Sequence, residues 1–172
     1  MSNEVLVLLG SASDMKITEK GLDLLKKLDT SFQLRVASAH RTPDHVYELV
    51  KDFDANGGKV ILCVAGKSAH LAGVVASMTL KPVLGIPVFT PETAGFDALL
   101  SMCQMPGGIP VGTMGIGSAG FSNACLHAVS IISLSCKERL KNLSEYRSYM
   151  KDTVIQSDLK NRQNFVRGEA LA

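Results

Sequence analysis

Short apolar segments alternate along the chain with stretches in which apolar residues recur every three or four positions. The short segments carry almost no charge, which is typical of strands buried on both faces of a parallel sheet. Only the second of them alternates apolar with polar residues. The pattern predicts five strands: Val5–Leu9, Phe32–Ala37, Val60–Ala65, Val83–Val88 and Val111–Ile116.

The segments between these strands have the period of amphipathic helices that cover a sheet. One helix is predicted to begin at Pro43, where a missing backbone N–H is tolerated, and to end before Gly57-Gly58, where left-handed backbone is favourable. The apolar stripes are Ile17, Leu24, Leu25 and Leu28 in the first helix, and Val46, Leu49, Val50 and Phe53 in the second.

This alternation predicts an α/β fold, a doubly wound three-layer sandwich with a five-stranded parallel sheet of flavodoxin-like form. With 172 residues, 46% of them hydrophobic, the chain is expected to form one domain over residues 1–172, with its core at about 4–134. Ligands of such sheets bind beyond the carboxyl ends of the strands. The loops after the strands are therefore the places to look for function.

The composition changes after Leu134, where charged residues become frequent. Apolar residues continue at helical spacing through this region, so a C-terminal helical extension is predicted at about 137–167. Two uses stay open for it, packing on a neighbouring subunit or forming a solvated or self-packed tail. Its apolar positions are Leu140, Leu143, Tyr146, Met150 and Val154.

Charge and composition exclude several classes of partner. Eighteen Lys and Arg against sixteen Asp and Glu give a net charge of +2, without the basic excess of a nucleic-acid-binding protein. No apolar run approaches the roughly 20 residues that span a bilayer, and residues 1–9 lack the features of a signal peptide. We expect a cytoplasmic protein with no membrane contact. The four cysteines form no metal-binding spacing, so reduced thiols and no metal are expected.

The loop Gly10–Asp14 follows the first strand and opens a helix, where free backbone N–H groups can cradle a phosphate. Ser11 and Ser13 add hydroxyl donors. Asp14 would repel a phosphate at its own position, so it suits helix capping or the hydroxyls of a ribose. The loop has neither the G-x-G-x-x-G nor the Walker spacing. Simple capping and turn formation is the alternative interpretation.

The loop after the second strand brings Ser38, His40 and Arg41 within four residues. Arg41 can bind a phosphate through two parallel hydrogen bonds, and an imidazole such as that of His40 can give and take a proton near neutrality. The alternative is a surface turn before the helix at Pro43.

The loop after the third strand contains Gly66, Lys67, His70 and Leu71. Gly66 permits close approach of a ligand, and Lys67 or His70 can meet an anion, although each is also common at a helix terminus. The region Gln104 to Gly120 is rich in glycine and proline; it suits a wall over a flat heterocycle or tight packing around the fifth strand. His45 and His127 are interpreted as structural, since both lie inside predicted helices.

Five segments of the chain, GSASD, SAHRTPD, AHLAG, PVLGIPV and QMPGGIPVGT, resemble the PurE family of aminoimidazole ribonucleotide carboxylases and mutases. The resemblance runs from Val5 to about Leu134. It implies a ribonucleotide substrate, no cofactor and a homo-octamer with sites formed between subunits. It also implies that His40 is the catalytic acid and base, that Ser11, Asp14, Ser38 and Arg41 hold the ribose phosphate, and that His70 and its loop line the base and carboxyl pocket.

The family has two branches that act on the same carbon atom. The mutase moves a carboxylate from the exocyclic nitrogen of N5-carboxyaminoimidazole ribonucleotide to carbon 4, and the other branch adds carbon dioxide to aminoimidazole ribonucleotide. SAHRTP, AHLAG and QMPGG resemble the mutase, whereas Lys67-Ser68 departs from its usual Gly-Ala. We therefore predict a mutase of purine biosynthesis, with the carboxylase as the alternative.

Two other function classes fit the predicted fold. A noncatalytic nucleotide-binding module can share the phosphate loop but does not need His40 beside Arg41. A Ser-His-Asp hydrolase is disfavoured because the G-x-S-x-G nucleophile elbow is absent.

Overall fold

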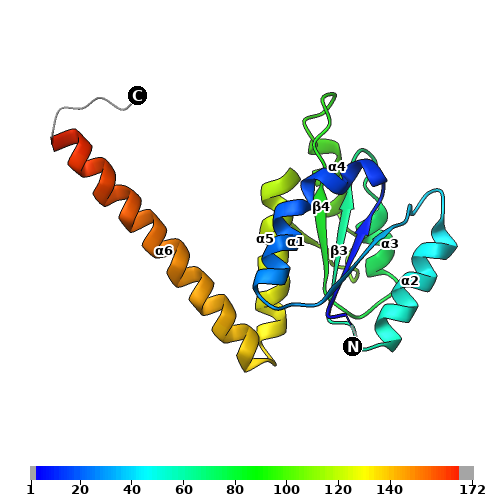
Figure 1. Ribbon diagram of the computed structural model, residues 1–172. Helices are drawn as coiled ribbons and strands as arrows, with labels where there is room; N and C mark the ends of the chain where they lie inside the picture. Colours follow the sequence, from blue (N-terminus) through cyan, green and yellow to red (C-terminus); the bar gives the residue numbers. More distant parts are fainter. Residues whose placement is uncertain (1–2, 167–172) are drawn as a thin grey trace.

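The fold is a five-stranded parallel sheet with helices on both faces, described for residues 3–166 by a computed structural model. The strands lie in the order β2-β1-β3-β4-β5, so β3 is the central strand, with β1 on one side and β4 on the other (Figure 1). This confirms the predicted doubly wound α/β fold. The strands are β1 Val5–Leu9, β2 Phe32–Val36, β3 Val60–Ala65, β4 Val83–Pro87 and β5 Gly112–Thr113.

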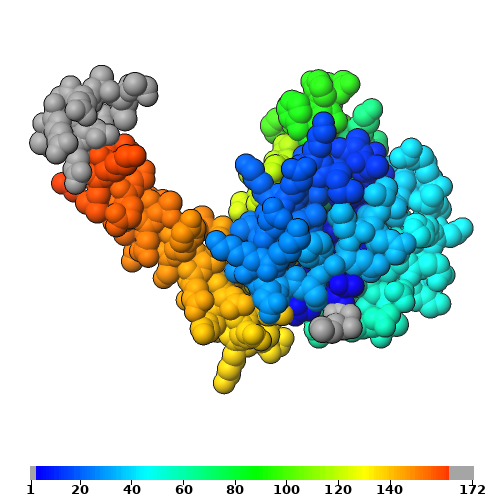
Figure 2. Space-filling model, viewed as in Figure 1, coloured from blue at the N-terminus to red at the C-terminus, as the bar shows by residue number. Residues whose placement is uncertain are grey.

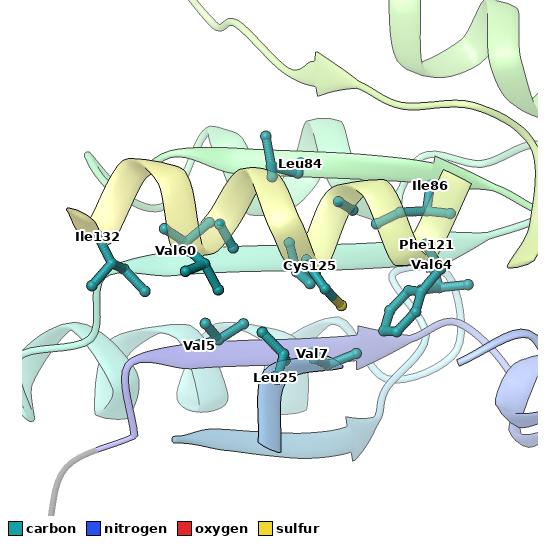
Figure 3. Packing of buried hydrophobic residues seen from close by; sticks show 14 of the residues in the cluster. Val5, Val7, Leu25, Val60, Val64, Leu84, Ile86, Phe121, Cys125 and Ile132 are labelled. Atoms are coloured by element: carbon teal, nitrogen blue, oxygen red, sulfur yellow. The ribbon is translucent and has the colours of Figure 1, made fainter. Parts of the chain in front are cut away.

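Alternate residues of the central strands feed two separate cores. Val5 and Val7 point toward one layer, where they pack with Phe121 and Cys125 (Figure 3). Leu6 and Leu8 point toward the other layer, and every residue of β1 and β3 is buried. The uncharged sequences of these strands follow from this burial on both faces. By contrast, β2 is an edge strand and is only partly buried, as its alternating sequence predicted.

The helices divide between the two faces according to these cores. α1 Glu19–Lys27 and α5 Gly117–Ser133 contribute to the core of Val5, and α2 Pro43–Ala55, α3 Leu71–Ala76 and α4 Phe96–Cys103 to the core of Leu6. A 3₁₀ turn, η1 Ala12–Ile17, precedes α1, so the predicted first helix is in fact two elements. The buried Thr18 separates them, and its hydroxyl donates to the Met15 carbonyl at 2.7 Å.

The boundaries of α2 are those that the sequence predicted. Pro43 occupies its first position, and Gly57 follows its end with a φ of 78°. The Gly58 N–H donates to the Phe53 carbonyl at 3.0 Å, which satisfies one of the terminal carbonyls of the helix. A side chain on Gly57 would strain this cap.

The fifth strand is shorter than predicted, because only Gly112 and Thr113 pair with β4. Its glycines allow close packing: a Cβ on Gly112 would lie 2.7 Å from Leu84 Cδ2. A Cβ on Gly120 would overlap the carbonyl oxygen of Gly115. The packing interpretation of the glycine-rich region is therefore the one that this chain supports.

The last helix, α6 Lys137–Val166, leaves the body of the molecule after its first turns (Figures 1 and 2). Arg139 anchors it through Glu4 at 3.2 Å and Asp29 at 3.0 Å, and Leu143 is buried against the core. Further along, Met150 and Val154 are exposed. The start of the helix thus packs on its own chain. The predicted end at Arg167 lies outside the described residues.

Two of the four free thiols lie in the core, on opposite faces of the sheet. Cys63 belongs to the core of Leu6, and Cys125 to the core of Val5. Burial raises the pKa of the Cys63 thiol, and it raises the pKa of Cys125 to about 12. None of the helices within residues 3–166 combines the length and the apolar character that crossing a bilayer requires.

Candidate active site

The loops that follow β1, β2 and β3 meet in one cleft of about 910 Å³ at the carboxyl ends of the strands. Parallel strands in this order bring their carboxyl ends to the same edge, so loops far apart in sequence become neighbours. All ten residues singled out in the sequence line this cleft: Ser11, Ser13, Asp14, Ser38, His40, Arg41, Gly66, Lys67, His70 and Leu71.

The first loop is organised by hydroxyl groups. Ser11 caps the 3₁₀ turn, and its Oγ accepts a hydrogen bond from the Ser13 N–H at 3.3 Å. Ser13 Oγ lies 2.8 Å from Ser11 Oγ and 3.1 Å from Asp14 Oδ1. The serine side chains that stabilise the start of the 3₁₀ turn therefore also line the cleft.

Asp14 is the one carboxylate among the cleft-lining residues of the described chain. Burial raises the pKa of this carboxyl, and hydrogen bonds from the Ser13 side chain and the backbone of the Ser11 loop oppose the shift without cancelling it. A carboxylate that loses hydration without gaining a cation destabilises the folded chain. A ligand with hydrogen-bond donors, such as the hydroxyls of a ribose, would replace the water that the Asp14 carboxylate loses on folding.

We expect Asp14→Asn to raise the melting temperature. Because the pKa is raised on folding, the unfolded chain releases this proton first, and the parent's free energy of unfolding falls as pH increases through that interval. The asparagine amide carries no charge, so the variant does not lose stability in this way, and its Oδ1 can still accept a hydrogen bond from the Ser13 hydroxyl. The gain should be small near about pH 3 and largest at neutral pH, which differential scanning calorimetry can follow.

The matched control for this prediction is Asp23→Asn, since Asp23 is exposed and forms an ion pair with Lys26 on the surface. A gain in melting temperature that is the same for both variants, or independent of pH, contradicts the assigned desolvation of Asp14.

The second loop is closed on itself by Thr42. The Ser38 N–H donates to Thr42 Oγ1 at 2.9 Å, and the Thr42 hydroxyl donates to the Ser38 carbonyl at 3.1 Å. The Arg41 N–H also lies 3.3 Å from Ser38 Oγ. These contacts satisfy the backbone and leave the side chains of His40 and Arg41 exposed to the cleft.

The two histidines of the cleft are in direct contact. His40 Nε2 lies 2.8 Å from His70 Nδ1, and the two rings are nearly perpendicular, with an interplanar angle of 85°. His40 comes from the loop after β2, whereas His70 stands at the start of α3. A hydrogen bond at this distance requires one of the two nitrogens to carry the proton and the other to accept it.

The third loop adds a cation and a glycine to the lining of the cleft. Lys67 is exposed and has a φ of 56°, in the left-handed region that side chains other than glycine rarely adopt. A Cβ on the preceding Gly66 would lie 3.2 Å from Val88 Cβ, so glycine allows the loop to approach the end of β4. Leu71, the residue after His70, is buried and adds an apolar side chain to the lining of the cleft.

Comparison with known proteins shows what kind of protein has these loops. The sequence matches the AIR carboxylase family over residues 4–153, which is most of the chain. The chain belongs to the AIR carboxylase family.

Relatives within the AIR carboxylase family align along nearly their whole length. The N5-carboxyaminoimidazole ribonucleotide mutase of Methanocaldococcus jannaschii is 47% identical over 161 residues, which are 94% of this chain and 99% of the relative. The mutase of Brucella melitensis is 43% identical and covers 91% of this chain and 96% of its own length. The crystal structure of Treponema denticola PurE superposes with a TM-score of 0.83 at 31% identity, covering 91% of this chain and 96% of that one.

Sequence reasoning missed part of the cleft of this AIR carboxylase family member. Val88, Phe89 and Thr90 line it directly after β4, as do small residues of the other loops. The same rule about strand ends would have found them, because β4 neighbours β3 in the sheet. Nothing from Gln104 to Gly120 lines the cleft in the described chain, and His45 and His127 are exposed on helices outside it.

Proposed function

We propose that this chain is an N5-carboxyaminoimidazole ribonucleotide mutase of purine biosynthesis, in which His40 moves the proton. The observation that carries the mechanism is the contact of His40 with His70 in a cleft that also contains Arg41. The mutase names of relatives that this chain matches almost from end to end support the reaction.

The reaction needs a proton at two different moments. Loss of the carboxylate from the exocyclic nitrogen leaves that nitrogen to be protonated and releases carbon dioxide. Carbon 4 then attacks the carbon dioxide and must lose its hydrogen to restore the aromatic ring. One imidazole can donate in the first step and accept in the second, provided that the cleft retains carbon dioxide between them. Neither step is a redox step, so the chemistry requires no electron acceptor or donor.

His70 supports this cycle because it can change its hydrogen bond as His40 changes its charge. When His40 is protonated, both of its nitrogens are donors, and His70 Nδ1 can accept. When His40 is neutral, either ring can donate to the other. The imidazole of His70 can therefore keep a hydrogen bond with His40 in both protonation states of His40, without placing a fixed charge beside it.

The same cleft supplies partners for the ribose phosphate. Arg41 and the hydroxyls of Ser11, Ser13 and Ser38 are suited to the phosphate, and Asp14 is suited to the ribose hydroxyls. The positive charges of Arg41 and Lys67 favour an anionic ligand.

The carboxylase reaction is the alternative, and the position of Lys67 in the cleft favours it. An ammonium group there can attract bicarbonate or stabilise a new carboxylate. We expect a higher kcat/KM with N5-carboxyaminoimidazole ribonucleotide in bicarbonate-free buffer than with aminoimidazole ribonucleotide plus bicarbonate. The opposite preference, abolished by Lys67→Gly, would assign the chain to the carboxylase branch. Binding of both nucleotides without turnover would favour the noncatalytic module.

We also propose a cytoplasmic homo-octamer, as the family resemblance implies. The exposed apolar residues of α6 support an interface between copies of the chain. Contact with a neighbouring copy would remove the side chains of Leu140, Met150 and Val154 from water. Light scattering should give a mass of about eight times the 18.4 kDa chain. Val154→Asp should lower that mass. A stable and active monomer is the result that contradicts this proposal.

A further inference from the structure

A phenyl ring stands in the cleft without a role in the proton chemistry. Phe89 follows β4 directly, lines the cleft and is 59% exposed. It carries the one phenyl ring among the cleft-lining residues of the described chain. Phe96, which begins α4, is similarly exposed at 60% but does not line the cleft.

The backbone at Phe89 is held from two sides. The Val88 N–H donates to the Ala65 carbonyl at 3.0 Å, which continues the pairing with β3 to the residue before Phe89. On the other side the chain folds back through Gly95, where a Cβ would lie 3.0 Å from the Val88 carbonyl oxygen and 3.3 Å from Phe89 Cα. The ring therefore projects from a fixed point of the sheet edge while most of its surface stays in contact with solvent.

The strand order puts Phe89 at the end of the cleft that a nucleotide base would reach. The loops with Arg41 and Ser11 follow β2 and β1, the His40–His70 contact spans the loops after β2 and β3, and Phe89 follows β4. A ligand whose phosphate lies at the loops after β2 and β1 extends across the cleft toward the loops after β3 and β4.

Stacking suits the chemistry of this heterocycle. The reacting atoms of an aminoimidazole, carbon 4 and the exocyclic nitrogen, lie on the edge of the ring, where His40 must reach them. A flat apolar side chain on the face of the ring holds it without occupying that edge. We propose that Phe89 is the platform on which the aminoimidazole ring of the substrate stacks. This inference rests on the proposed function and adds a binding residue to it.

The test separates the ring from the rest of the nucleotide. Dissociation constants for aminoimidazole ribonucleotide and for ribose 5-phosphate are measured by calorimetry with the parent and with Phe89→Ala. Loss of the stack should weaken binding of the nucleotide roughly 5- to 100-fold, as is usual for removal of an aromatic partner from a base. Binding of ribose 5-phosphate, which has no ring to stack, should change less than about twofold.

Two further variants complete the experiment. Phe89→Tyr keeps the aromatic face and should bind the nucleotide within about threefold of the parent. Phe96→Ala removes an equally exposed phenyl ring outside the cleft and should change neither constant. Equal weakening of both ligands by Phe89→Ala, or no weakening of either, overturns the stacking role. A parent protein that does not bind aminoimidazole ribonucleotide overturns the proposed function, and this inference with it.

Discussion

His40→Asn is expected to fold like the parent and bind the ribonucleotide, but to lose about 100- to 10,000-fold in kcat, the usual contribution of a general acid and base. Asparagine can keep a hydrogen bond toward His70, so the loop should stay in place. It cannot carry a proton between the exocyclic nitrogen and carbon 4. Steady-state kinetics with N5-carboxyaminoimidazole ribonucleotide measures the loss.

His45→Asn is the control for this prediction, because His45 is an exposed histidine on α2 that does not line the cleft. It should retain the parent's kcat. If His40→Asn turns over within about tenfold of the parent, the proton is moved by another group, and His70 becomes the first candidate.

Arg41→Ala should act on binding more than on turnover. Arg41 is exposed and lines the cleft, where the fixed fork of its guanidinium can pair with two phosphate oxygens. Losing a charged pair of this kind costs about 2 to 4 kcal/mol, which is roughly 30- to 800-fold in the dissociation constant. Calorimetric titration with aminoimidazole ribonucleotide measures it directly.

Lys59→Ala offers a matched change of charge at the opposite edge of the sheet, since Lys59 is exposed next to the amino end of β3. It should leave the dissociation constant close to that of the parent. An unchanged constant in Arg41→Ala removes Arg41 from the phosphate site.

The first four strands could be predicted from sequence to within one residue at their ends. For β1, β3 and β4 the reason is that burial on both faces leaves an uninterrupted apolar run, whereas the partly buried β2 shows the alternation of apolar and polar residues. The fifth could not. Val111–Ile116 has a strand-like composition, but its pairing with β4 stops after Gly112 and Thr113. Composition does not reveal where the pairing of an edge strand stops. The sequence also did not reveal the 3₁₀ turn before α1. Ile17 fits the apolar stripe of a continuous α-helix as well as it fits the end of a separate 3₁₀ turn.

The sequence also indicated which loops would form the cleft, because parallel strands end at the same edge. It did not indicate that His40 and His70 touch, since they stand 30 positions apart and the packing of α2 and β3 between them sets that distance. Nor did it single out Phe89, because a phenylalanine after an apolar strand looks like a continuation of the core. Only its exposed fraction distinguishes it from buried rings such as Phe53.

Cys63 and Cys125 lie on opposite faces of the sheet, so the rate at which each thiol is labelled reports how often the layer around it opens. Both thiols are shielded, and their raised pKa values keep them protonated and unreactive until the surrounding layer separates. An alkylating reagent should label the exposed Cys103 at once. If the two layers open independently, the two buried thiols will be labelled at different rates; if the sheet opens as a unit, they will share one rate.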